Sequence, residues 1–208
     1  MSTDADTDNP VATVRGSPHS VFRYDRFMQV VHWTTFLVLT ATFAAAWLVR
    51  YADTREQANG LVQLHRALGL TALFITACRL LWRFVARIPP LPPDLPPLQR
   101  LAARINEYAL YALLLLQPTL GFLYSSASRT SVVVSILGAI PSPLTPDRNL
   151  ARLLFTAHGL VARCLLGLIA LHVAAALFHH FVRGDDVLVA MLPRRRPPRT
   201  DTAGSEAP

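Results

Sequence analysis

Four long stretches of the chain are apolar and almost free of charge. The first, Phe27 to Val49, holds no charged residue. As a helix rising about 1.5 Å per residue, it is long enough to cross about 30 Å of hydrocarbon. By residue number the four stretches are about 27–49, 61–85, 105–125 and 153–182. The pattern predicts an all-α fold, a transmembrane four-helix bundle.

The segments around these stretches are of a different kind. Residues 1–22 are polar and contain no apolar core of a cleavable signal peptide, and residues 193–208 are rich in arginine. Both are predicted to be disordered tails on one membrane domain, residues 23–192. Six prolines between Ile88 and Pro97 predict an extended connector between the second and third spans.

The connection between the third and fourth spans, Ser125 to Ala151, is predicted to be a loop. Inside it, Val132 to Ile140 is apolar but too short to cross a bilayer. We expect this segment to lie at the membrane interface.

Composition supports a membrane protein and argues against nucleic-acid binding. Apolar residues make up 52% of the chain and charged residues 16%, against about 25% charged in ordinary soluble domains. The net charge is +7, but the basic residues flank apolar segments and form no single patch. Of the 20 basic residues, all arginine, 13 fall on the side of the two termini and seven on the other. The positive-inside rule then places both termini in the cytoplasm.

Histidines at two depths carry the candidate chemistry. His32 lies near the cytoplasmic start of the first span, and His65 near the outer start of the second. His158 and His172 are 14 residues apart on the fourth span, which is about 40° short of four full turns, so they share a face and are separated by about 21 Å. We therefore expect His32 to meet His172 at the inner level. His65 is expected to meet His158 at the outer level.

Two facing imidazoles in an apolar bundle suit the axial positions of a haem iron. The sequence has no C-x-x-C-H motif for covalent attachment, so it predicts two non-covalent b haems per chain. With both axial positions filled, the iron has no open position for oxygen, which favours electron transfer. Histidine pairs without metal, acting as proton relays in a haem-free transporter or scaffold, are the alternative.

Two arginines are candidates for pairing with haem propionates. Arg79 is 14 residues after His65 and falls at the inner level, and Arg163 lies within the fourth span near the outer level. Snorkelling to the headgroups is an equal alternative for Arg79. His179, seven residues after His172, is a candidate contact for a quinone head or a propionate, and an interfacial histidine without a ligand is its alternative.

In this order, these residues resemble the bacterial cytochrome b561 family, four-helix dihaem proteins of the inner membrane. The matching pieces are Phe27 to Trp33 with His32-Trp33, Leu64-His65-Arg66, Arg79-Leu80-Leu81-Trp82-Arg83 followed by prolines, His158-Gly159, His172 to His180, and Asp185 to Pro193. They span about residues 23 to 196. The resemblance implies that His32, His65, His158 and His172 are the axial ligands, which agrees with the depth argument. It also implies quinol as an electron donor and, by similarity to some relatives, a quinol-linked superoxide oxidase.

The expected function is a dihaem b-type cytochrome, an oxidoreductase that carries electrons across the inner membrane between the quinone pool and an unidentified acceptor or donor. Arginines on the outer side, such as Arg129, Arg148 and Arg152, would steer an anion such as superoxide. The alternative is the cytochrome b anchor subunit of a larger dehydrogenase or hydrogenase, bound to a redox partner subunit.

Overall fold

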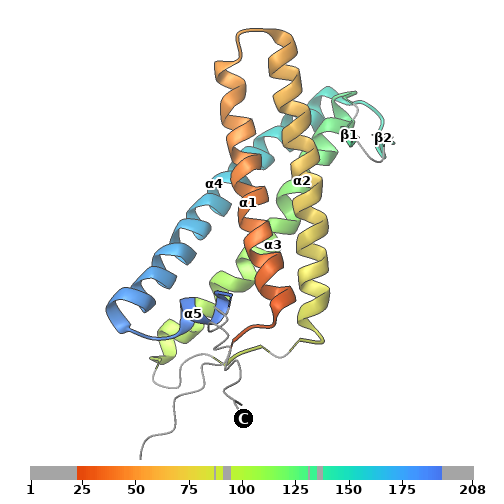
Figure 1. Cartoon of the computed structure of the whole chain (residues 1–208). Coiled ribbons are helices and arrows are strands. Elements are labelled where there is room, and N and C mark those ends of the chain that lie inside the picture. Colours follow the sequence, from red (N-terminus) through yellow and green to blue (C-terminus); the bar gives the residue numbers. More distant parts are fainter. Residues whose placement is uncertain (1–22, 87, 91–94, 131, 135–137, 194–208) are drawn as a thin grey trace, which may run out of the picture.

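Four long helices make up most of the described chain, as shown in Figure 1. In the computed structural model they are α1 (Arg26–Leu48), α2 (Arg55–Arg83), α3 (Pro97–Ala127) and α4 (Arg148–Phe178). All four are long and apolar enough to cross a membrane, which confirms the predicted transmembrane four-helix fold. The structure describes residues 23–86, 88–90, 95–130, 132–134 and 138–193. The predictions for residues 1–22 and 194–208 lie outside these ranges.

Polar caps and a proline decide where the helices begin. The side chains of Asp25, Thr54 and Asp147 accept hydrogen bonds of 2.7–3.2 Å from backbone N–H groups in the first turns of α1, α2 and α4. Pro97 begins α3, where a missing N–H costs nothing. These signals lie before the apolar runs, so α2, α3 and α4 start five to eight residues earlier than the runs predict.

Several short elements connect or extend the helices. They are η1 (Val49–Tyr51), the strands β1 (Val132–Val134) and β2 (Gly138–Ile140), the π-helix η2 (His179–Arg183) and α5 (Val187–Met191). The strands correct the prediction of a loop over residues 125–151. Helix α3 continues to Ala127, and β1 pairs antiparallel with β2, with Val132 opposite Ile140. Pairing satisfies those backbone N–H and C=O groups of the two strands that face each other.

The helices pack in chain order. α1 contacts α2, α2 contacts α3, and α3 contacts α4, while β1 lies against α2. In Figure 1, α1 and α2 stand side by side, and α4 slants so that its lower end lies away from α1. We call the end with η1 and the strands the hairpin end, and the opposite end, where residues 23 and 193 lie, the terminal end.

Hydrogen bonds tie the two described ends of the chain together. The Arg23 guanidinium donates to the Val189 carbonyl at 3.0 Å, and the Tyr24 backbone N–H donates to the Ala190 carbonyl at 3.1 Å. The Trp33 indole N–H donates to the Met191 carbonyl at 3.1 Å. Both described ends therefore lie on one side of the bundle, as an even number of spans requires.

Candidate functional site

Two pairs of histidines face each other across neighbouring helices, one pair toward each end of the bundle. At the terminal end, the ring centres of His32 on α1 and His172 on α4 are 6.2 Å apart. At the hairpin end, the ring centres of His65 on α2 and His158 on α4 are 6.1 Å apart. These are the pairs expected from their depths in the sequence. Helix α4 supplies one histidine to each pair, and α1 and α2 supply the others.

Both separations match two imidazoles that bind one metal ion from opposite sides. An imidazole nitrogen binds a first-row metal at about 2.0–2.1 Å, and the ring centre lies about 1.1 Å behind that nitrogen. Two such ligands in line have ring centres about 6.3 Å apart. Direct hydrogen bonding between two imidazoles needs only a nitrogen–nitrogen distance of about 2.9 Å, which puts in-line ring centres about 5.1 Å apart. The observed spacing fits a metal between the rings better than direct contact.

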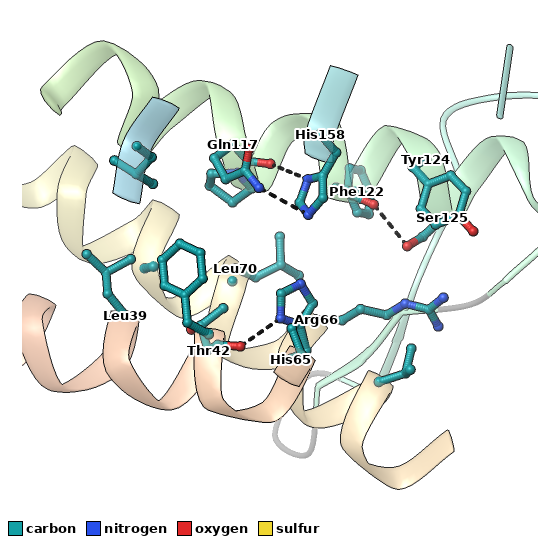
Figure 2. A pocket seen from close by; sticks show the side chains of 18 of the residues that line it. Leu39, Thr42, His65, Arg66, Leu70, Gln117, Phe122, Tyr124, Ser125 and His158 are labelled. Atoms are coloured by element: carbon teal, nitrogen blue, oxygen red, sulfur yellow. Dashed lines mark hydrogen bonds between the residues drawn. The ribbon is translucent and has the colours of Figure 1, made fainter. Parts of the chain in front are cut away.

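A cavity of about 420 Å³ surrounds the histidine pair at the hairpin end. All four long helices contribute to its walls, which are mainly apolar, with Leu39, Leu70 and Phe122 among the residues shown in Figure 2. Its polar lining includes His65, Arg66, Gln117 and His158. An apolar cavity with a few convergent polar groups is the usual form of a cofactor site.

The backbone fixes the orientation of both histidines at the hairpin end. The Nδ1 atom of His65 lies 2.9 Å from the Thr42 carbonyl oxygen, and the Nδ1 atom of His158 lies 3.1 Å from the Gln117 carbonyl oxygen. A carbonyl only accepts, so each Nδ1 carries the proton and each Nε2 keeps its lone pair. Metal-ligating histidines are typically held in this way by their second nitrogen.

Helix α3 forms a slot for the His158 ring, as Figure 2 shows in part. The Gln117 side-chain amide donates to His158 Nε2 at 3.1 Å, so this amide must turn away when Nε2 binds a metal. One turn later, a Cβ added at Gly121 would lie 3.0 Å from His158 Cε1, so only glycine leaves the ring its full space. Neither residue was singled out from the sequence. The available signal was a glutamine in an apolar run directly before Pro118 and four residues before a glycine.

The pair at the terminal end has a different environment. His172 is exposed, although its ring centre lies 6.2 Å from that of His32 on α1. The Nδ1 atom of His32 and the Nε atom of Arg79 are both buried without a hydrogen-bond partner. The Arg79 guanidinium lies 5.5 Å from the centre of the Tyr111 ring, and its charge acts on both histidines. Arg79 therefore lies at the level predicted for it, beside the terminal-end pair.

The second candidate arginine lies on α4 one turn beyond Gly159, as expected, but does not line the cavity. The side chain of Arg163 is exposed and does not belong to the cavity lining, although its Nη1 atom would lie 3.8 Å from a Cβ at Gly159. Arg66, adjacent to His65 in the sequence, lines the cavity instead. At the hairpin end, Arg66 is therefore the better-placed candidate for pairing with a haem propionate.

His179 belongs to a polar network at the end of α4. Its Nδ1 atom lies 2.6 Å from an Asp185 carboxylate oxygen, which also accepts from Arg183 Nε at 3.2 Å. Gly184 adopts a left-handed conformation with φ of 65° and turns the chain back toward α5. The network fixes the His179 ring at the terminal end, beyond the histidine pair.

Comparison with known proteins agrees with this geometry. The family model for prokaryotic cytochrome b561 matches residues 23–194. Cytochrome b561 homolog 1 of Escherichia coli K12 is 31% identical over 179 residues, which cover 84% of this chain and 99% of that protein. Cytochrome b561 homolog 2 of the same strain is 29% identical over 171 residues, covering 82% and 91%. A Yersinia pestis protein named probable superoxide oxidase CybB is 26% identical over 166 residues, covering 80% and 93%. The chain belongs to the prokaryotic cytochrome b561 family, and it is a haem b-binding electron-transfer protein that crosses the bacterial inner membrane several times.

Proposed function

We propose that the protein binds two b haems, one between His32 and His172 and the other between His65 and His158. The observation that carries this proposal is the pair of ring separations, 6.2 Å and 6.1 Å, each close to that of two axial ligands on one metal. A haem iron with both axial positions filled exchanges single electrons and has no open position for oxygen. The protein then acts as a two-centre path for electrons between the two faces of the membrane.

The side chains around each pair have defined roles in this proposal. The apolar walls of the hairpin-end cavity would exclude water from the haem, and Arg66 would hold one of its propionates. Arg79, with its unpartnered buried Nε, has the same role at the terminal end. Arg163 is not needed at the hairpin end, because Arg66 is the arginine that lines the cavity.

The arginine distribution supports an orientation with the terminal end in the cytoplasm. Thirteen of the 20 arginines belong to the terminal side of the sequence and seven to the other side. In this orientation the His32–His172 pair lies toward the cytoplasm and the His65–His158 pair toward the outside. Exchange with the quinone pool is assigned to the terminal end, where the network of His179 and Asp185 offers a polar contact at the interface.

Superoxide is the proposed partner at the hairpin end. Arg129 and Thr130 line a second cavity of about 210 Å³, and Phe122 lines both this cavity and the histidine cavity. A cation beside the outer site attracts an anion from solution. The overall chemistry balances, because two superoxide anions give up two electrons and leave as dioxygen, while one quinone takes two electrons and two protons to become quinol. The relative named as a probable superoxide oxidase supports this choice.

The test is to count haems per polypeptide in the purified membrane protein and in single histidine-to-alanine variants. We expect two haems in the natural chain and one in each variant, with His32→Ala and His172→Ala losing the same haem by its absorption spectrum. His65→Ala and His158→Ala are expected to lose the other. His180→Ala, outside both pairs, serves as the control. A single haem in the natural chain, or losses grouped in any other way, would contradict the proposal.

Superoxide as a partner needs a separate measurement. With quinone present, the purified protein is expected to speed the loss of superoxide and to form quinol in proportion. If quinol forms only when a co-purifying iron–sulfur subunit is present, the protein is an anchor subunit instead.

A further inference from the structure

The two histidine pairs differ in how the protein holds their second ring nitrogens. At the hairpin end both Nδ1 atoms lie within hydrogen-bond distance of main-chain carbonyls, 2.9 Å for His65 and 3.1 Å for His158. At the terminal end the Nδ1 atom of His32 is buried without a partner. Within the described part of the chain, no hydrogen bond reaches the His172 ring either. The four histidines therefore form one pair that is hydrogen-bonded to the main chain and one pair that is not.

A hydrogen bond from Nδ1 to a carbonyl changes how strongly a histidine donates electrons to a metal. When a carbonyl accepts a hydrogen bond from Nδ1–H, the imidazole becomes more basic and donates more strongly through Nε2. Stronger donation stabilises the more positive, ferric state of the iron and lowers its reduction potential. Two supported ligands act together at the hairpin end, and their effects have the same sign.

Both sites also have charged side chains near the histidines. Each site has an arginine close to its histidines, Arg66 at the hairpin end and Arg79 at the terminal end. A nearby positive charge favours the ferrous state, which carries less positive charge. At the terminal end Arg79 acts on both histidines, and Glu107 acts on His172 with the opposite sign. The inference therefore rests on the hydrogen bonds of the ligands.

We propose that the hairpin-end haem is the lower-potential centre and the terminal-end haem the higher-potential centre, because only the hairpin-end ligands are hydrogen-bonded to the main chain. This inference rests on the dihaem function proposed above and extends it with a direction. A single electron is then held mainly at the terminal end, and transfer from the hairpin end toward the terminal end is downhill. Thr42 and Gln117 act through their carbonyls as positioning residues for the hairpin-end ligands.

The test is a redox titration of the purified dihaem protein, followed by its absorption spectrum. We expect two one-electron waves. His158→Ala, with only the terminal-end haem, should keep the higher wave, and His172→Ala should keep the lower one. The reverse assignment, or two waves at the same potential in the natural protein, would overturn the inference. A natural chain with only one haem would instead refute the proposed function, so the two failures are distinguishable.

Milder variants keep the test valid if the alanine variants do not fold. His158→Met and His172→Met retain a protein ligand, and a methionine ligand raises the potential of its own site. We expect His158→Met to move the lower wave upward and His172→Met to move the higher one. The opposite pattern would refute the assignment.

The hydrogen bond itself is tested at Gly121. Gly121→Ala pushes the His158 ring away from the Gln117 carbonyl, since the new Cβ would lie 3.0 Å from Cε1. The lower wave should move upward in Gly121→Ala, while the higher wave stays in place. Gly60→Ala, where an added Cβ meets nothing within 4 Å, should move neither wave. If Gly121→Ala moves only the higher wave, the hydrogen bond is not the cause of the difference.

Discussion

Replacing Gly121 with alanine separates haem binding from the stability of the helix. The added Cβ would lie 3.0 Å from His158 Cε1, while comfortable carbon–carbon contacts are about 3.5–4.0 Å. The ring must therefore move by roughly 0.5 Å or more. His158 Nδ1 starts 3.1 Å from the Gln117 carbonyl oxygen. A shift of this size away from α3 lengthens that distance to about 3.6 Å, at which the hydrogen bond is lost.

The two consequences have opposite signs. Losing the hydrogen bond removes about 1 kcal/mol of interaction, and loss of such a support for a metal-ligating histidine lowers metal affinity about 10–100-fold. Alanine in place of glycine inside a helix, however, favours the helix by roughly 0.8–1 kcal/mol. We therefore expect Gly121→Ala to leave the haem-free chain at least as stable as the natural one, while the hairpin-end haem binds about 10–100-fold more weakly.

The assay is a titration of haem into the haem-free protein in detergent, with absorbance reporting bound haem and thermal unfolding reporting stability. Gly60→Ala is the matched control, because it makes the same helix change in α2 where an added Cβ meets nothing within 4 Å. Haem binding as tight as in the natural chain would refute the proposed role of the slot. Weaker binding together with an equal loss in Gly60→Ala would show a general effect of the substitution.

Three further predictions concern the polar groups around the bundle. Arg83 and Glu107 form a two-pronged ion pair with distances of 2.5 and 3.2 Å, so Glu107→Gln should lower the free energy of unfolding by about 2 kcal/mol, less than for a fully buried pair because Glu107 is partly exposed; an unchanged unfolding temperature would contradict this. Burial alone would raise the pKa of Asp185, but hydrogen bonds, first from His179, outweigh it and lower that pKa below its ordinary value of 3.8. The stabilisation by this carboxylate is therefore complete above about pH 3.8 and is lost as the pH falls through the folded-state pKa. The protection of the amides in residues 185–192, relative to their intrinsic exchange rate at each pH, should therefore fall at acid pH in the natural chain and at all pH values in Asp185→Asn. Arg129→Gln should slow the reaction with superoxide about tenfold at low ionic strength and much less at high salt; a salt-independent loss would exclude steering.

The sequence predicts the helices well and their ends poorly. A long run without charge that crosses hydrocarbon forms a helix, because the backbone N–H and C=O groups then hydrogen-bond within the same segment. The ends depend on groups outside the apolar runs. Helix α3, for example, begins at Pro97 and has two turns that contain Gln99, Arg100 and Arg104 before the apolar run that starts at Ile105. The length of an apolar run indicates only the part of a helix that lies in the hydrocarbon, so helix turns outside the membrane are not predicted by it.

The pairing of β1 with β2 is not predicted by the sequence, for a related reason. Strand pairing depends on contacts between residues several positions apart and on the helix that the strand lies against, here α2. The sequence shows only that the segment is apolar and short. An interfacial segment and a hairpin share that pattern, and only the second satisfies the backbone groups internally.

For the arginines, spacing along a helix predicts which face of the helix each side chain lies on. Arg79 is 14 residues after His65, about 40° short of four full turns, so its face was predictable, and the structure places it beside the terminal-end pair. Arg163 is five residues after His158, which turns it by about 140° from that histidine. Its exposed side chain outside the cavity follows from that angle. Depth alone suggested Arg163, whereas depth combined with angle excludes it from the face of His158.

Arg66 and Gln117 mark the limit of that reasoning, because their roles depend on the neighbouring helices. Arg66 is turned by about 100° from His65, yet it lines the cavity because α3 closes that side with Tyr124 and Ser125. Gln117 supports a histidine on another helix, 41 residues away in the chain. No pattern within one helix specifies which carbonyl of a neighbour an imidazole will meet. The sequence therefore predicts which residues can bind haem, whereas the difference between the two sites depends on helix packing.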